Sequence, residues 1–261
     1  MIGVFDSGLG GLSVLAAIAR ALPRADLCYL ADTAHVPYGN KPDDFIRGRV
    51  LAIGKQLVEQ GCTLLVVACN TATAAALTEL RHQHPGIPVV GVEPGVKPAA
   101  ASSITHHIAV LATEATARSE RLARLIRDHA ANVQVQVEPC AGWATRVETL
   151  HFDSPEFNAE IRAKVQPLLA QGVDRIVLGC THYSFLAPVL EPLIGHQAQL
   201  VDVAEPVAKQ VLRLATASAQ GSARLHLNAT AHPERLHAAL PALGLGWLAQ
   251  RANQGLHDTP A

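Results

Sequence analysis

Two cysteines stand at the ends of two apolar runs that have the length of β-strands. Cys69 follows "LLVVA" and Cys180 follows "RIVLG", and a threonine and then a predicted helix come within two residues of each. A thiol at such a place lies near free backbone N–H groups and the positive end of a helix dipole, and both favour the thiolate. The pair therefore indicates acid/base chemistry at sulfur.

A single buried cysteine is usually an ordinary small core residue. Two cysteines in matching contexts, about one lobe apart, instead predict two similar halves that each supply a thiol to a shared cleft. Two opposed acid/base groups are what a racemase without pyridoxal phosphate needs. One group removes the proton at Cα, and the other delivers a proton to the opposite face.

Two further residues suit this chemistry. Asp6 follows the first apolar run in "VFDSG", and His182 stands two residues after Cys180 in "CTH". Each could orient a neighbouring thiol or exchange protons with it. Each also has a simpler interpretation, as a helix cap for Asp6 and as a surface histidine for His182.

Short apolar runs alternate with longer stretches of helical period along the chain. The predicted strands are 2–5, 27–31, 64–68, 89–92, 108–112, 133–137, 176–178 and 200–203, and the clearest helices are 12–22, 43–60, 71–84 and 155–171. Unbroken apolar strands are covered by helices on both faces, so the sheets should be mainly parallel, with ligands at their carboxyl ends. We expect an α/β fold of two pseudo-symmetric lobes with the active site in the cleft between them.

The chain crosses between lobes at two predicted points. A Pro-bounded, Ala-rich segment near residue 98 enters a new strand, and "DVAEPVAKQ" at 202–210 could return the chain to the first lobe. The first lobe would then be discontinuous, with residues 1–97 and 208–261, and the second lobe would hold residues 98–207. The pair His106 and His107 is expected at the surface, before a strand.

Composition narrows the classes of partner. The 21 basic and 22 acidic residues are interspersed and give a formal charge of −1, so neither nucleic acid nor a membrane surface is an expected partner, and a small-molecule substrate is. Five cysteines without short paired spacing favour free thiols in a reducing compartment. No apolar stretch reaches the roughly 18 residues of a membrane span, and the start lacks a signal peptide, so a cytoplasmic protein is expected.

Six motifs together resemble those of glutamate racemases, from residue 2 to about residue 240. In order they are "VFDSGLGGLSVL", "ADTAHVPYGNK", "VVACNTATAAAL", "VVGVEPGVKPA", "TEATARS" and "VLGCTHYSFL". The resemblance implies a cofactor-independent enzyme, with no metal, pyridoxal phosphate or nucleotide, that supplies D-glutamate for bacterial peptidoglycan. It also implies a homodimer.

The same resemblance implies roles for individual residues. Cys69, assisted by Asp6, would act on D-glutamate, and Cys180, assisted by His182, on L-glutamate. Glu148 in "ATRVETL" is the nearest match to a further acidic residue of the family, although its flanking residues depart from the family pattern. Hydroxyl, amide and backbone N–H groups would hold the substrate at Ser7, Tyr38, Gly39, Asn70, Thr71, Thr113, Thr116 and Thr181. Simple helix capping would also explain Thr71 and Thr181.

Four other functions remain open from the sequence. "GLGG" after the first strand and Asp32 after the second could indicate a dinucleotide site, but Ser13 stands where the third glycine belongs. A zinc hydrolase could use Asp6, Cys69, Cys180 and His182, although their spacing is wide. The others are a non-catalytic amino-acid-binding protein and an aspartate racemase, whose usual Met-Gly-Pro motif is not found at the start of this chain.

Overall fold

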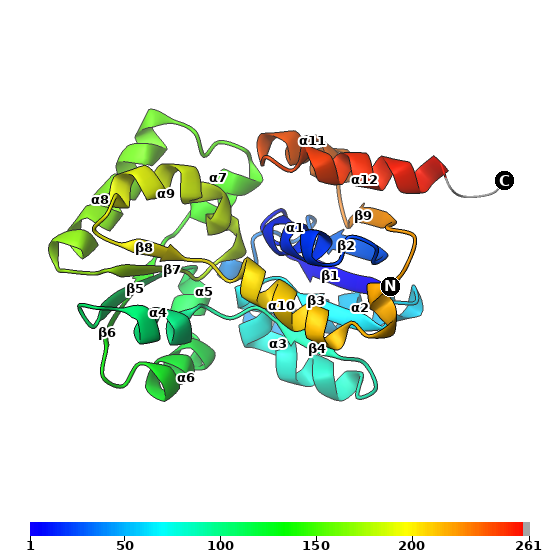
Figure 1. Cartoon of the computed structure of the whole chain (residues 1–261), viewed down its shortest axis with the longest axis horizontal. Coiled ribbons are helices and arrows are strands. Elements are labelled where there is room, and N and C mark those ends of the chain that lie inside the picture. Colours follow the sequence, from blue (N-terminus) through cyan, green and yellow to red (C-terminus); the bar gives the residue numbers. More distant parts are fainter. Residues whose placement is uncertain (258–261) are drawn as a thin grey trace.

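Two parallel sheets, one in each lobe, organise the computed structural model, which describes residues 1–257 (Figure 1). The first sheet has the order β4-β3-β1-β2-β9 and the second the order β6-β5-β7-β8, and all neighbouring strands are parallel. The strands are β1 Ile2–Asp6, β2 Leu27–Ala31, β3 Leu64–Val67, β4 Val89–Gly91, β5 His107–Ala112, β6 Gln134–Pro139, β7 Arg175–Leu178, β8 Gln199–Val201 and β9 Leu225–Ala229. The predicted α/β class with mainly parallel sheets is confirmed.

Helices cover both faces of each sheet. The first lobe has α1 Leu12–Ala21, η1 Tyr38–Asn40, α2 Asp43–Glu59, α3 Asn70–Gln83, α10 Ala204–Leu214, η3 Ala217–Ala219, α11 Pro233–Ala242 and α12 Gly246–His257. The second lobe has α4 Val96–Ser102, α5 Glu114–Ala117, α6 Glu120–His129, α7 Trp143–Glu148, α8 Pro155–Ala170, η2 Thr181–Leu186 and α9 Ala187–Ile194. None of these helices, within residues 1–257, is long and apolar enough to cross a membrane.

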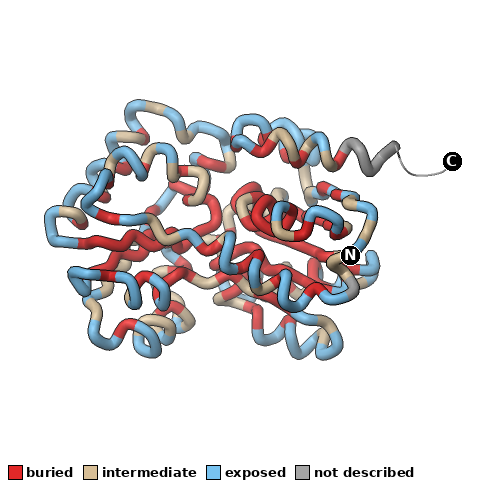
Figure 2. Tube along the Cα trace, viewed as in Figure 1, coloured by how far each residue is buried: buried red, intermediate tan, exposed pale blue. Residues whose placement is uncertain are grey.

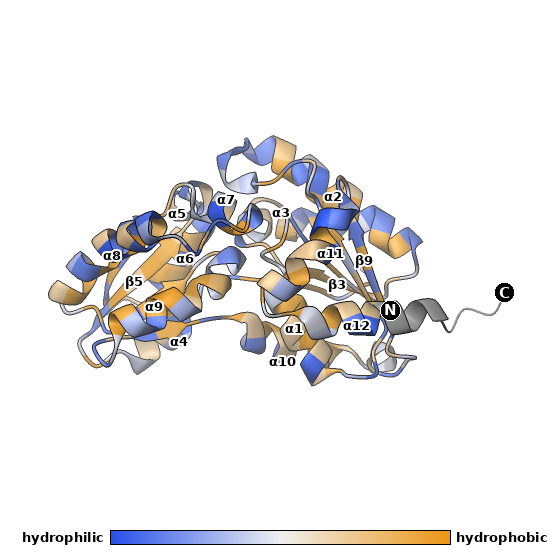
Figure 3. Cartoon of the chain, turned by 90° about the horizontal axis from the view of Figure 1, so that it is seen from above, coloured by the Kyte–Doolittle hydropathy of each residue, from blue (hydrophilic) through white to orange (hydrophobic). Residues whose placement is uncertain are grey.

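The inner strands of both sheets are red in Figure 2 because they are buried, and they are mainly apolar in Figure 3. In the first lobe, α2 and α3 pack on one face of the sheet, through residues such as Ile53 and Leu77, and α1 and α10 lie against the other. In the second lobe, α7, α8 and α9 share a core with one face, and α4 and α6 cover the other. Burial on both faces explains the unbroken apolar runs of the inner strands, such as β1, β3, β5 and β7, whereas β6 at the edge of the second sheet alternates Val with Gln and is only partly buried.

Strand β9 is present in the structure but was not predicted from the sequence. Its sequence "LHLNA" alternates, with Leu225 and Leu227 buried and His226 and Asn228 exposed. It pairs with β2 at the edge of the first sheet, so only one of its faces is covered. An edge strand of this kind has a period of two and no continuous apolar run.

The expectation of a surface histidine pair is wrong for His107. This residue begins β5 and is only 7% exposed, and its Nδ1 lies 3.0 Å from the carbonyl oxygen of Gln171. His106, the residue before it, is exposed and has a positive φ of 55°. The turn into the strand therefore directs the two neighbouring side chains into different environments.

Each sheet reverses its strand order at one point. In the first sheet the chain adds β2 on one side of β1 and then β3 on the other, and in the second it adds β6 and then β7 on the two sides of β5. Such switch points form crevices at the carboxyl ends of the strands. The two lobe boundaries stay predictions; the second, between residues 207 and 208, falls within α10, which packs on α1.

Candidate active site

The two cysteines occupy equivalent places at the two switch points. Cys69 follows β3, beside β1, and is the N-cap residue of α3. Cys180 follows β7, beside β5, and is the N-cap residue of η2. Each cysteine is only 6% exposed, and Asp6 links their segments, because it contacts both Thr181, next to Cys180, and Ser7, which contacts the Cys69 sulfur. The structure therefore brings the two thiols to one region between the lobes.

The carboxylate of Asp6 connects the segments that carry the two thiols. It accepts hydrogen bonds from the backbone N–H groups of Ser7, at 2.6 Å, and of Gly11. Its Oδ2 also accepts from Thr181 Oγ1 of the second lobe at 3.3 Å. On the other side, the Cys69 sulfur lies 3.9 Å from Ser7 Oγ and interacts with Asp6 itself. The N-cap of η2 is Cys180 and the Thr181 hydroxyl bonds to Asp6 instead of a helix N–H, so the capping interpretation of Thr181 is wrong.

Cys180 has a different set of neighbours. Its sulfur lies 3.5 Å from Nδ1 of His182, whose Nε2 lies 2.5 Å from Oε1 of Glu148. The same Glu148 oxygen accepts a hydrogen bond from the backbone N–H of Leu9 at 2.6 Å. Because Glu148 ends α7 of the second lobe and Leu9 belongs to the first, this carboxylate joins the two lobes. His182 is only 3% exposed, so the surface interpretation of this residue is wrong.

The protonation states of the two halves differ. Burial raises the pKa of the Cys69 thiol well above its ordinary value, and the nearby Asp6 carboxylate raises it further. Burial also raises the pKa of Asp6, although the charge of His182 opposes this. Burial alone would lower the pKa of His182, but Cys180 and Glu148 raise it well above its ordinary value. The surroundings of Cys69 therefore favour the neutral thiol, and those of His182, beside Cys180, favour the imidazolium.

The glycines of "GLGG" make room for residues of the second lobe. A Cβ atom on Gly8 would lie 2.1 Å from Glu148 Oε1, and one on Gly10 would lie 2.4 Å from His182 Nδ1. These glycines allow the first lobe's backbone to approach the catalytic candidates of the second. The acid of the proposed dinucleotide site, Asp32, is fully buried and bonded to protein groups, so it is not free to bind a ribose.

Three predicted substrate-binding hydroxyls meet across the cleft. Thr71 Oγ1 at the start of α3 lies 3.1 Å from Thr113 Oγ1 and 3.3 Å from Thr116 Oγ1, which both belong to the second lobe. Thr113 is also the N-cap of α5 and accepts from the backbone N–H of Thr116. Gly39 packs against the same threonine, since a Cβ there would lie 3.0 Å from the Cβ of Thr113.

Asn70 carries unused hydrogen-bonding capacity. It is only 4% exposed, yet neither its amide nitrogen nor its amide oxygen has a hydrogen-bond partner among residues 1–257. Buried amides are normally paired, because an unpaired polar group in the interior costs free energy. The residue follows Cys69 directly, at the N-terminus of α3, where N–H groups and the helix dipole attract anions. Asn70 is therefore suited to bind a polar ligand beside this thiol.

The Tyr38 hydroxyl is already engaged within the protein. It donates to Asp32 Oδ2 at 2.6 Å, and Arg49 binds both oxygens of that carboxylate at 2.9 Å. Thr230 donates to Asp32 as well, at 2.8 Å. This network fixes η1, which carries Tyr38 and Gly39, to the rest of the first lobe. The substrate-binding role of Tyr38 stays a prediction.

In the part of the chain that the structure describes, no group of three or more His, Cys, Asp or Glu side chains has the arrangement of a metal site. Asp6, Cys69, Cys180 and His182 lie near one another but are joined by hydrogen bonds through Ser7 and Thr181. The zinc hydrolase interpretation thus lacks a ligand set in residues 1–257.

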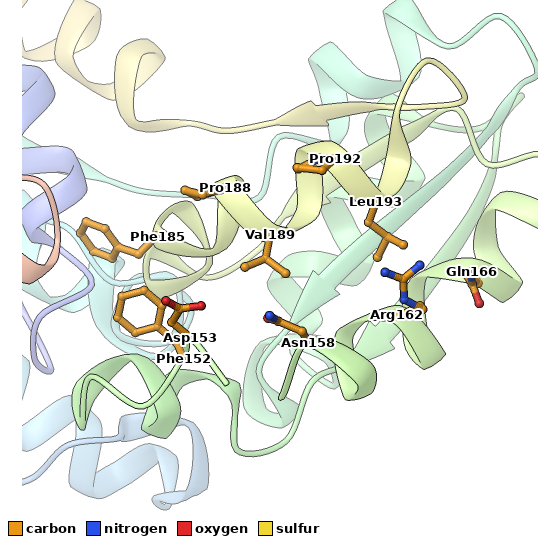
Figure 4. Close-up of a pocket in the computed structure, with 10 residues that line it drawn as sticks. All are labelled: Phe152, Asp153, Asn158, Arg162, Gln166, Phe185, Pro188, Val189, Pro192 and Leu193. Atoms are coloured by element: carbon orange, nitrogen blue, oxygen red, sulfur yellow. The ribbon is translucent and has the colours of Figure 1, made fainter. Parts of the chain in front are cut away.

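Two cavities reach residues of the site, and a third lies away from it. One of about 460 Å³ lies between the lobes and reaches Thr71, and one of about 440 Å³ reaches Leu9 and Glu148. A third, of about 580 Å³, lies between α8 and α9, where Figure 4 shows Asn158 opposite Val189 and Arg162 opposite Leu193. Neither thiol lines any of these three cavities, and each cysteine is only 6% exposed.

Two buried residues around the site have structural roles that their sequence patterns did not predict: Tyr29 was given no role, and Asp32 was considered only for a dinucleotide site. Tyr29 donates a hydrogen bond to the carbonyl of Gly8 at 2.5 Å, and Asp32 holds η1 in place. Tyr29 lies within the apolar run "LCYLA", where it has the pattern of a core residue. Asp32 stands at the carboxyl end of β2, and this position was a usable signal.

Sequence comparisons identify close relatives. The profile of the Asp/Glu/Hydantoin racemase family matches residues 2–211. A protein of Pseudomonas aeruginosa strain PAO1 named glutamate racemase is 45% identical over 246 residues, which cover 93% of each chain. A glutamate racemase of Stutzerimonas stutzeri strain A1501 is 43% identical over 245 residues, with the same coverage of both chains.

Solved structures have the same fold. The glutamate racemase isoform RacE1 of Bacillus anthracis superposes with a TM-score of 0.81 at 29% identity over 94% of both chains. The Escherichia coli glutamate racemase in complex with L-glutamate and the activator UDP-MurNAc-ala has a TM-score of 0.81 at 32% identity. That match covers 93% of the present chain and 94% of the other.

Proposed function

The chain belongs to the Asp/Glu/Hydantoin racemase family, and we propose that it interconverts L- and D-glutamate through two cysteines. The observation that carries this proposal is the chain of hydrogen bonds that runs from Cys69 through Ser7 and Asp6 to Thr181, the residue that follows Cys180. It joins one thiol from each lobe in a buried, shared region. Relatives more than 40% identical over 93% of the chain, all named glutamate racemase, favour glutamate as the substrate.

In the L-to-D direction, Cys180 acts as the base. The His182 imidazolium donates from Nδ1 to the Cys180 sulfur and stabilises the thiolate, and Glu148 holds the other ring nitrogen. The thiolate removes the α-proton of L-glutamate and becomes a thiol. The electron pair of the C–H bond remains on Cα and its carboxylate.

Cys69 then acts as the acid. Its raised pKa keeps it protonated in the empty site, so it can deliver a proton to the opposite face of the planar carbon. The product is D-glutamate, and Cys69 is left as a thiolate beside Asp6. Starting from D-glutamate, Cys69 and Cys180 exchange these roles. One proton is removed and one is delivered in each turnover, without any change in oxidation state.

Neutral donors bind the substrate in this proposal. The free amide of Asn70 and the hydroxyls of Ser7, Thr71, Thr113, Thr116 and Thr181 can bind the carboxylates and the ammonium without forming a salt bridge to either thiol. Tyr38 and Gly39 complete this set from η1. Since both thiols are 6% exposed, the lobes must separate to admit glutamate and close again over it.

The cellular role follows from the product. D-Glutamate formed by this reaction would supply peptidoglycan synthesis in a bacterial cytoplasm, and a homodimer is the expected assembly. These parts of the proposal rest on the resemblance to glutamate racemases and on the free state of all five cysteines.

The decisive experiment measures racemisation and α-proton exchange together. Purified protein with L-glutamate in D₂O, with a chelator present throughout, is followed by circular dichroism and by the NMR signal of the α-proton. The wild type should lose optical activity and incorporate deuterium. Cys69→Ala and Cys180→Ala should each reduce racemisation by about 10³-fold or more, because both groups act on one carbon.

Cys28→Ala is the matched control. Cys28 is also a buried cysteine, but it lies within β2 and contacts Asn228 rather than the site. This variant should racemise at the wild-type rate. Unchanged turnover in either Cys69→Ala or Cys180→Ala would refute the two-thiol mechanism, and inhibition of the wild type by chelator would indicate a metal enzyme instead.

A further inference from the structure

One buried hydroxyl reaches the turn between β1 and α1. Tyr29 lies in β2, the neighbour of β1 in the first sheet (Figure 1), and is fully buried. Its hydroxyl donates to the carbonyl oxygen of Gly8 at 2.5 Å. A buried hydroxyl that donates to one specific carbonyl restricts the orientation of that peptide group.

The carbonyl of Gly8 and the N–H of Leu9 belong to the same planar peptide unit. In a trans peptide these two groups point in opposite directions, so fixing one fixes the other. The Leu9 N–H donates to Glu148 Oε1 at 2.6 Å, across the cleft from Tyr29. Tyr29 therefore holds one side of a peptide plane whose other side binds the second lobe.

The same Glu148 oxygen contacts His182. Its distance to His182 Nε2 is 2.5 Å, and the other ring nitrogen of this histidine faces the Cys180 sulfur. A rotation of the Gly8–Leu9 peptide would remove one donor from Glu148 and release it from the position that orients the imidazole. In this turn, Asp6 accepts hydrogen bonds from the backbone N–H groups of Ser7 and Gly11, which lie outside that peptide plane.

We propose that Tyr29 is a positioning residue, which fixes the Gly8–Leu9 peptide against Glu148 and so keeps His182 aligned on Cys180. It touches neither thiol and acts only through this chain of contacts. The proposal rests on the racemase activity proposed above and adds that the Cys180 half of the site depends on a hydroxyl in the opposite lobe. The Cys69 half does not depend on it in this way.

Tyr29→Phe tests the proposal, because it removes the hydroxyl and keeps the ring in the core. We expect kcat/KM to fall by about tenfold, the order of one buried hydrogen bond. L- and D-glutamate have equal free energies, so kcat/KM must fall equally in both directions. Primary deuterium isotope effects identify which thiol's proton transfer is slowed. In Tyr29→Phe, the isotope effect on kcat/KM should rise with α-deuterated L-glutamate and fall with α-deuterated D-glutamate.

A double-mutant cycle tests whether Tyr29 acts through Glu148 rather than through Asp6. In a Glu148→Gln background, Tyr29→Phe should cost less than twofold, because the contact it supports is already weakened. In an Asp6→Asn background it should cost the full tenfold. Equal costs in the two backgrounds would overturn the proposal, as would a single Tyr29→Phe variant whose kcat/KM stays within twofold of the wild type.

Ser103→Ala provides the matched control for stability. Ser103 is also a buried hydroxyl, and it donates to Asp174 at 2.6 Å, away from the thiols. This variant should lower Tm without changing kcat/KM or either isotope effect. If it reproduced the effects of Tyr29→Phe, these would come from general destabilisation and the proposal would fail. An inactive wild type would contradict the proposed function itself, so the two failures are distinguishable.

Discussion

The two halves of the site are equivalent in topology and different in chemistry. Cys69 and Cys180 each follow the strand beside the first strand of their sheet, at the switch point. Cys69 lies beside a buried carboxylate, Asp6, whereas Cys180 faces an imidazole that is backed by Glu148. A carboxylate disfavours a neighbouring thiolate and an imidazolium favours it. The same backbone position therefore has a neighbour that opposes ionisation of the thiol in one lobe and a neighbour that favours it in the other, as the proposed mechanism requires.

This difference suits a reaction that inverts one carbon. A racemase needs one protonated and one deprotonated group at the moment the substrate binds, and two identical half-sites would have no means to set that state. The neighbours of the two thiols provide it. In the proposed mechanism, Cys180 is the base that accepts the α-proton of L-glutamate, and the form left after that turnover has Cys69 as the base for D-glutamate.

The largest expected effect comes from removing one thiol, and each removal should abolish α-proton exchange of a different enantiomer. Cys180→Ala should exchange the α-proton of D-glutamate with D₂O but not that of L-glutamate, and Cys69→Ala should do the reverse. Both should racemise about 10³-fold more slowly than the wild type, since exchange needs one thiol and inversion needs two. NMR of each pure enantiomer measures this. Exchange of the same enantiomer by both variants would contradict the assignment of the two thiols.

A second comparison substitutes the partner of each thiol. His182→Asn and Asp6→Asn should each lower kcat/KM by about 10²-fold, within the range for a group that supports acid/base transfer. The primary isotope effect should rise with α-deuterated L-glutamate in His182→Asn and with α-deuterated D-glutamate in Asp6→Asn. Isotope effects that moved the same way in both variants would mean that the partners do not serve separate thiols.

Glu148→Gln changes the pH dependence. Glu148 is one of the groups that raise the pKa of His182, so its neutral replacement lowers that pKa and the imidazolium is lost at a lower pH. The alkaline limb of kcat/KM should therefore move to lower pH, with a loss of roughly tenfold at pH 9. A profile of kcat/KM between pH 6 and pH 10 for the wild type and Glu148→Gln measures the position of the alkaline limb. An unmoved limb would exclude His182 as the group that titrates there.

The smallest effect concerns folding. The pKa of His182 is raised in the folded protein, so its stabilising effect is complete below the unfolded pKa of about 6.5 and is lost as pH rises through the folded pKa. Relative to His182→Gln, the wild type should gain most in Tm below pH 6.5 and progressively less above it. Each kcal/mol corresponds to about 2–4 °C. A difference in Tm that did not vary with pH would contradict the raised pKa.

Sequence patterns predicted what depends on strands and their ends. Both thiols, Asp6 and Thr181 follow apolar runs, and parallel strands bring such residues to one edge. Glu148 was identified through resemblance alone, because the end of a short helix carries no such signal. Its contact with Leu9 depends on how the lobes face each other. Tyr29 could not be recognised because its role depends on which carbonyl its hydroxyl reaches, and the sequence "LCYLA" indicates only a buried strand.

The late position of β9 affects the order in which the lobes can form during synthesis on the ribosome. The first sheet takes four strands from residues 2–91, but its edge is completed only by residues 225–229. All four strands of the second sheet, between residues 107 and 201, emerge before that segment. Until then, β2 presents an unpaired edge to the nascent chain's surroundings. The lobe that begins first is thus the last to be finished.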